Sequence, residues 1–112
     1  MTDNDLRRIG DVLNLAKEVS NFLPVDFEIF SKNLILIRAV ERSVELIGES
    51  AGKISLETRE VISDVEWRKV MDLRIILAHN YQRVNLPTLW QAATVDVPEL
   101  ARILQTHVDH PQ

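Results

Sequence analysis

Cysteine is absent from this sequence of 112 residues, and its absence excludes several classes of protein. Without thiols the chain forms no disulfide framework, has no thiolate nucleophile and offers no cysteine ligands to zinc or to an iron–sulfur cluster. Glycine occurs three times and proline four times, which is too few for an all-β protein with its frequent turns. No apolar run is longer than about five residues, so the sequence predicts no membrane-spanning helix.

The composition that remains is that of a globular protein. Apolar residues make up 46% of the chain and charged residues 27%, a balance too apolar for a disordered chain. The length is that of one domain, and we expect a single domain over residues 1–112. Residues 1–5 are acidic and polar, unlike a signal peptide, so we expect a cytoplasmic protein.

Charge is distributed unevenly along the chain. The formal net charge is −4, which argues against a uniformly basic nucleic-acid-binding protein. Residues 67–83, however, contain four basic side chains and one acidic side chain, whereas the segments on either side are net acidic. This stretch is therefore the expected place for an anionic partner.

The spacing of apolar residues is helical along nearly the whole chain. It predicts a helix over residues 3–22, a second from Asp26 to about residue 51, a short turn over 55–62, a third long helix opening at Asp64, and a closing helix from about 86 to 107. Asp96 followed by Pro98 indicates that the closing helix restarts or kinks there. Four main helices with short connections predict an all-α, antiparallel up-and-down four-helix bundle with a short extra helix.

Gly48 lies inside the second predicted helix, where glycine costs about 1 kcal/mol relative to alanine. Two explanations stay open at this point. Either two helices approach closely at Gly48, or the last turn of the helix is frayed.

Several polar residues have spacings that chemistry could use. His107 and His110 could hold a metal ion if a further ligand folded back, but a polar tail explains them more simply. Glu41 and Glu45 share a helix face with basic neighbours, which is typical of a solvated surface. The sequence predicts no metal ion and no cofactor.

Arg74 and His79 form a combination suited to cleaving RNA without a metal ion. Histidine transfers protons near neutral pH, and arginine stabilises the charge that develops on phosphorus. In an unbroken helix, however, positions 74 and 79 lie about 140° apart around the axis and roughly 7.5 Å apart along it. For both to act on one phosphate, the helix must loosen near residue 79 or a second subunit must complete the site. The alternative is a chance pairing of two surface residues at a helix end.

A longer likeness surrounds this pair. The segment Arg74-Ile75-Ile76-Leu77-Ala78-His79-Asn80-Tyr81 resembles the Arg-x4-His-x-Tyr motif of the HEPN ribonuclease superfamily. Four further stretches are similar to the same superfamily: residues 46–51, 67–74, 84–90 and 97–100. The likeness is to its HepT branch, prokaryotic toxins encoded beside a minimal nucleotidyltransferase antitoxin called MntA.

The resemblance implies a HEPN-like bundle that forms a homodimer, with the two motifs meeting across a cleft, and a metal-independent endoribonuclease activity on RNA, with tRNA the expected substrate. Arg74 would orient and stabilise the scissile phosphate. His79 would be the general acid–base for attack by the ribose 2′-hydroxyl, leaving a 2′,3′-cyclic phosphate. Tyr81 would support the site and accept AMP from the MntA-type antitoxin, which would block the cleft with a bulky anion.

Other residues around the motif have less defined roles. Asn80 is a possible supporting residue, and Arg68, Lys69 and Arg83 could contact RNA phosphates or could equally be solvated surface charges. Ile75 stands where many family members carry a polar residue, so cleavage could be slower or differently specific.

Two questions stay open from the sequence. The first is whether the chain is an enzyme, because the alternative function is a non-catalytic helical module of the same fold that binds nucleotide or the nucleotidyltransferase partner. The second is whether the assembly is a dimer or a larger complex with that partner.

Overall fold

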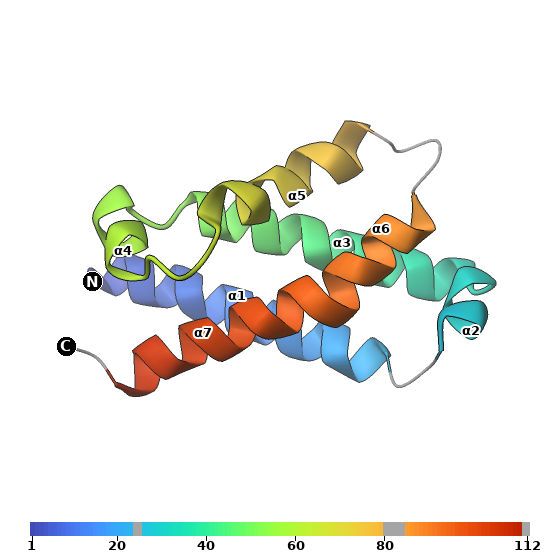
Figure 1. The fold of residues 1–112 in the computed structure, drawn as a ribbon, viewed down its shortest axis with the longest axis horizontal. Coiled ribbons are helices and arrows are strands. Elements are labelled where there is room, and N and C mark those ends of the chain that lie inside the picture. Colours follow the sequence, from blue (N-terminus) through green and yellow to red (C-terminus); the bar gives the residue numbers. More distant parts are fainter. Residues whose placement is uncertain (24–25, 80–84, 111–112) are drawn as a thin grey trace.

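The computed structural model describes residues 1–23, 26–79 and 85–110, and over residues 75–79 it describes the backbone only. The regular elements of these residues are all helices (Figure 1). Their bounds are α1 Asp3–Phe22, α2 Phe27–Ser31, α3 Leu34–Gly52, α4 Leu56–Val61, α5 Trp67–His79, α6 Leu86–Gln91, the π-helical turn η1 Ala92–Asp96, and α7 Val97–Asp109.

The long helices run alternately in opposite directions (Figure 1). Helix α3 packs against α1 on one side and α5 on the other, and α7 packs against α1. Helices α6 and α7 are joined through η1 into one rod that returns toward the end of the molecule where α1 begins (Figure 1). The prediction of an all-α, up-and-down bundle is confirmed.

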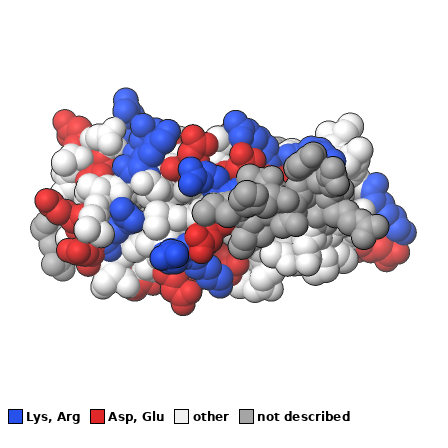
Figure 2. All heavy atoms as spheres, turned by 90° about the horizontal axis from the view of Figure 1, so that it is seen from above, with Lys and Arg blue, Asp and Glu red and all other residues white. Residues whose placement is uncertain are grey.

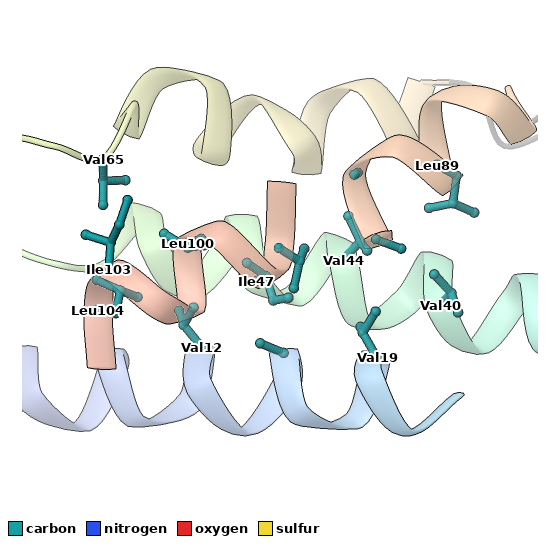
Figure 3. Close-up of a cluster of buried hydrophobic side chains, with 14 of the residues drawn as sticks. Val12, Val19, Val40, Val44, Ile47, Val65, Leu89, Leu100, Ile103 and Leu104 are labelled. Atoms are coloured by element: carbon teal, nitrogen blue, oxygen red, sulfur yellow. The ribbon is translucent and has the colours of Figure 1, made fainter. Parts of the chain in front are cut away.

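The core lies between α1, α3 and α7, with a contribution from α6 (Figure 3). Helix α1 buries residues spaced three or four apart, so they share one face: Ile9, Val12, Ala16 and Val19. Helix α3 does the same with Ile37, Val40, Val44, Ile47 and Ala51. Burying each aliphatic side chain of valine size or larger stabilises the fold by about 1.5–3 kcal/mol, so this face sets the positions of the three helices.

One buried carboxylate ties the start of α1 to the start of α4. Asp5 is 1% exposed, and its carboxylate accepts hydrogen bonds from the backbone N–H of Ser55 at 2.8 Å and from the hydroxyls of Ser55 and Thr58, each at 2.7 Å. Its carboxylate also reaches back to the N–H of Thr2 in a capping box at the start of α1. These hydrogen bonds, led by those from the Ser55 N–H and Thr58, hold the pKa of Asp5 far below its usual range.

The second helix predicted from Asp26 to about residue 51 is wrong as a single helix. Asp26 caps only α2, and the chain turns at residues 32–33 before Asn33 caps α3 by accepting from the N–H of Leu36 at 3.0 Å. Phe27 and Phe30 pack on Trp90 of α6, with ring centroids 5.5 and 5.1 Å apart. We attribute the turn to this distant contact and to the Asn33 cap, because the apolar stripe alone continues through it.

The third long helix begins three residues later than predicted, at Trp67 rather than Asp64. The indole N–H of Trp67 donates to the carbonyl oxygens of Ile62 and Arg59, at 2.9 and 3.0 Å. These bonds hold Trp67 against the preceding α4 segment. The residues between α4 and Trp67 form a turn, so Asp64 does not cap the helix.

Of the two predictions for Asp96, a restart is wrong, because Asp96 does not cap a new helix. The backbone continues through η1, where the N–H of Val97 bonds to the carbonyl of Ala92 in the wider π pattern. Pro98 lies in the first turn of α7, directly after this wider turn. Helix α7 then extends to Asp109, two residues beyond the predicted end.

Within the residues that the structure describes, none of the helices has the length and apolar character needed to cross a membrane.

Candidate active site

Helix α5 carries the described part of the predicted site. Its backbone is helical from Trp67 through His79, so Arg74 and His79 belong to one uninterrupted element. The side chain of His79 lies outside the described residues, as do Asn80, Tyr81 and Arg83 entirely. The structure therefore describes Arg74 in full and gives His79 a backbone position.

Arg74 lies at a close approach of α5 to α3. The contact is at Gly48, at which an added Cβ would stand 3.0 Å from the backbone nitrogen of Arg74 and 3.3 Å from its Cβ. Arg74 as a whole is nevertheless exposed. The backbone and Cβ of Arg74 therefore lie against α3, while the residue as a whole is open to solvent. Of the two explanations for Gly48, close helix approach is confirmed.

The unbroken helix constrains how the motif can work. Positions 74 and 79 on α5 are separated by about 140° around the axis, because each residue adds about 100°. The backbone does not loosen between these positions. The described part of one chain thus offers no local distortion that would bring the two positions to one side.

Arg68 and Lys69 lie on the first turn of α5 and are well exposed, with 90% and 63% of their side chains accessible. Nε of Arg68 is 3.8 Å from a carboxylate oxygen of Asp72, and Nζ of Lys69 is 3.6 Å from one of Asp96. Figure 2, which views the molecule from the α5 side, shows acidic side chains interspersed among the basic ones. The basic stretch of the sequence therefore forms no continuous basic patch within the described residues, although such exposed pairs open readily.

A hollow of about 290 Å³ lies beside α5, between it and the η1–α7 rod. Its floor is apolar, with Val70 and Leu73 on one side and Leu100 and Ile103 on the other. Its lining also includes four carboxylate residues and a single lysine: Asp64, Glu66, Asp96, Glu99 and Lys69. Carboxylates repel phosphates, so this hollow does not have the character of an RNA-binding site.

The other polar candidates of the sequence, His107, Glu41 and Glu45, lie beside charged side chains of the chain. Nε2 of His107 lies 3.4 Å from a carboxylate oxygen of Asp64. No group of three or more metal-ligating side chains occurs among the residues with described side chains. Glu41 and Glu45 each pair with an arginine three residues earlier, at 3.3 and 3.1 Å, in keeping with a solvated surface.

Sequence comparisons place this helical bundle in a family. A family model described as "Ribonuclease HepT-like" matches residues 12–107, which include the second half of α1 and everything from there to the last turn of α7. The chain belongs to the HepT-like ribonuclease family. The resemblance noted in the sequence is confirmed.

Individual relatives point the same way. The chain is 33% identical over 104 residues to "Putative RNase MJ1380" of Methanocaldococcus jannaschii, covering 91% of this chain and 95% of that one. It is 37% identical over 78 residues to "Putative RNase TTE0752" of Caldanaerobacter subterraneus, covering 70% of each. It is 28% identical over 95 residues to "Probable ribonuclease HepT" of Thermococcus cleftensis, covering 85% and 84%. No solved structure matches the chain significantly.

Two features of this HepT-like chain were not foreseen from its sequence. The first is the set of hydrogen bonds that Asp5 accepts from Ser55 and Thr58, called the Asp5 clasp below, which joins residues about fifty positions apart. The sequence indicated only its local part, through the spacing of Thr2 and Asp5 that is typical of a capping box. The anchoring of Trp67 at the start of α5 had no local signal, because its two acceptors are backbone carbonyls that any residue could supply.

Proposed function

We propose that this HepT-like protein is a metal-independent endoribonuclease in which Arg74 and His79 act on one RNA phosphate. The observation that carries the proposal is the placement of Arg74, fixed at its root against α3, exposed at its head, and followed by His79 in the same helix of a ribonuclease-family chain.

The chemistry follows from the two side chains. His79 as general base removes the proton of a ribose 2′-hydroxyl, whose oxygen attacks the adjacent phosphorus. The P–O5′ bond breaks, and the leaving oxygen takes a proton from the imidazolium. The products are a 2′,3′-cyclic phosphate and a 5′-hydroxyl. Arg74 binds the non-bridging oxygens and stabilises the additional negative charge of the pentavalent phosphorus.

The site is completed by a second copy of the chain. Positions 74 and 79 lie on different sides of an unbroken helix, so Arg74 of one copy and His79 of the other are better placed to share a phosphate than two residues of one chain. This supports a homodimer with the two α5 helices facing each other across the cleft.

Substrate and regulation are part of the same proposal. tRNA is the substrate, with Asn80 supporting the site and Arg68, Lys69 and Arg83 available to RNA phosphates. The protein acts as a toxin, and an MntA-type nucleotidyltransferase neutralises it by transferring AMP to Tyr81, either on the dimer or within a larger complex. The name of the Thermococcus relative, a ribonuclease HepT, supports the toxin assignment. Tyr81 is the only tyrosine of the chain, so an AMP group found on a tyrosine would be on Tyr81.

The test is cleavage of end-labelled total tRNA, with and without EDTA, by wild type, Arg74→Ala and His79→Ala. We expect wild-type cleavage to survive EDTA and both variants to lose at least about a hundredfold, since each removes a group used in the transition state. Arg102→Ala is the matched control, because Arg102 is exposed and pairs with Glu99 on α7. Its cleavage should equal that of wild type.

Two results would overturn the proposal. Cleavage retained in both Arg74→Ala and His79→Ala would remove the mechanism. A wild type that binds tRNA but produces no new RNA ends, while carrying no AMP by intact mass, would instead identify a non-catalytic binding module.

A further inference from the structure

All three glycines of the chain lie in helices, which allows their surroundings to be compared directly. A Cβ added at Gly10 of α1 would meet nothing within 4 Å among the described residues. A Cβ added at Gly52, the last residue of α3, would stand 3.9 Å from the sulfur of Met71, an ordinary van der Waals contact. Neither position requires glycine for space.

Gly48 differs from both because its neighbour is a backbone. A Cβ there would stand 3.0 Å from the backbone nitrogen of Arg74 and 3.0 Å from the backbone oxygen of Val70. Backbone atoms cannot rotate away as the end of a methionine side chain can. A larger residue at position 48 therefore displaces this turn of α5 from α3 by a few tenths of an ångström.

We propose that Gly48 is a positioning residue for Arg74. The missing side chain lets the turn of α5 that carries Arg74 lie directly on α3, and this contact sets the point from which the guanidinium reaches the scissile phosphate. The inference rests on the proposed role of Arg74 in RNA cleavage. It adds that α3, a helix with no residue in the motif, determines the geometry of the site.

Simple helix packing is the competing explanation, and it makes different predictions. If Gly48 served only stability, its replacement would change unfolding and leave the chemistry of the folded protein intact. If it positions Arg74, the folded variant is a poorer catalyst. Substrate binding depends on many contacts and should change little, whereas transition-state stabilisation depends on the exact placement of one guanidinium.

The experiment compares Gly48→Ala with Gly52→Ala and Gly10→Ala in tRNA cleavage and thermal unfolding. All three exchange glycine for alanine in a helix, so any general effect of helix propensity is common to them. We expect Gly48→Ala to lower kcat about tenfold with KM within about twofold of wild type, because sub-ångström displacement of a catalytic group is costly. The two control variants should keep wild-type kcat and KM. Gly48→Ala is also made in the Gly10→Ala background, because alanine stabilises the interior of helix α1 relative to glycine. This offsets a loss of stability caused by crowding at position 48.

A double-mutant cycle tests whether the effect passes through Arg74. In an Arg74→Ala background, measured in single turnover at high enzyme concentration, Gly48→Ala should cause no further loss, because the group it positions is gone. A second loss of about tenfold in that background would overturn the inference and assign Gly48 to general packing.

The remaining outcomes separate this inference from the proposed function. Wild-type kcat in folded Gly48→Ala overturns the positioning role and leaves the ribonuclease proposal intact. A wild-type protein that does not cleave tRNA overturns the ribonuclease proposal first, and the positioning role falls with it.

Discussion

Helix α3 has one side against α1 and the other against α5, and the two contacts are built differently. Toward α1 and α7 the packing is between branched apolar side chains such as Val12, Val44 and Leu104, all 0% exposed (Figure 3). Toward α5 the helices meet through backbone at Gly48, and two apolar residues on the described part of α5, Val70 and Leu73, are only partly buried. The side toward α1 and α7 holds fully buried side chains, and the side toward α5 holds a candidate catalytic residue that is exposed.

This division has a physical reason. A deeply buried face tolerates little change in shape, because its side chains interlock and each lost methylene is felt. Under the proposed function the α5 face binds RNA, and such a face has to leave polar groups accessible. Close backbone contact at Gly48 positions α5 firmly without covering Arg74.

The largest expected difference between the two sides is in stability. Leu104→Ala on the buried side should lower the free energy of unfolding by about 3 kcal/mol, and Leu73→Ala on α5 by about 1 kcal/mol, because the cavity left at a half-buried site fills with water or collapses. Urea unfolding followed by circular dichroism measures both. Equal losses of unfolding free energy in the two variants would mean that α5 belongs to the same rigid core as α7. That result would contradict the difference between the two sides of α3.

A smaller effect, with a defined pH dependence, is expected at the Asp5 clasp. Its pKa is lowered in the folded protein, so the stability that it contributes is present above its unfolded pKa of about 4 and is lost as the pH falls toward the folded pKa. Asp5→Asn should cost about 1–3 kcal/mol at pH 7, since it removes a charged acceptor and places an amide N–H₂ among the donors of Ser55 and Thr58.

The measurement is the difference in unfolding free energy between wild type and Asp5→Asn at several pH values from 7 to 3. This difference should shrink below about pH 5. A difference in unfolding free energy that stays constant with pH would show that the Asp5 carboxylate does not cause the loss of stability in acid. The hydrogen bonds of Asp5 go to Thr2, Ser55 and Thr58 and not to the turn of α5 that carries Arg74, so tRNA cleavage at pH 7 and at a temperature where both proteins are folded should be unchanged.

The smallest expected change in stability concerns the start of α5. Trp67→Phe keeps an aromatic ring but removes the indole N–H that donates to Ile62 and Arg59, which should cost about 1 kcal/mol in unfolding free energy. Because these bonds anchor the first turn of the helix that carries Arg74, we expect cleavage to fall by more than stability suggests. Thermal unfolding and tRNA cleavage at the same temperature test this. Wild-type cleavage would indicate that Gly48 alone sets the position of α5.

Much of the fold could be predicted from the sequence, and the errors share one cause. Helix α1 was predicted with its observed bounds because a capping threonine, an apolar stripe and a proline two residues beyond its end are all local signals. The turn at residues 32–33 depends on Trp90, far along the chain, and the late start at Trp67 depends on a bond to Arg59, eight residues earlier. A periodicity of apolar residues contains no information about such contacts.

The candidate site, like the fold, could be predicted from the sequence only in part. The motif from Arg74 to Tyr81, the family and the candidate chemistry were all accessible from residue identity and spacing. The placement of Lys69 beside Asp96 was not, because the sum of charges over residues 67–83 takes no account of Asp96, the last residue of η1, which lies thirteen residues beyond that stretch.

The sequence by itself determined which segments are helical, which faces are apolar and which residues can transfer protons or bind a phosphate, because helix geometry and side-chain chemistry act over a few neighbouring residues. Only the tertiary structure decided where helices end against distant partners, how Asp5 is paired, and which of the two explanations of Gly48 holds. A glycine in a helix is unfavourable when the helix is considered alone. It becomes favourable when a second backbone occupies the space of its missing side chain, as the α5 backbone does at Arg74.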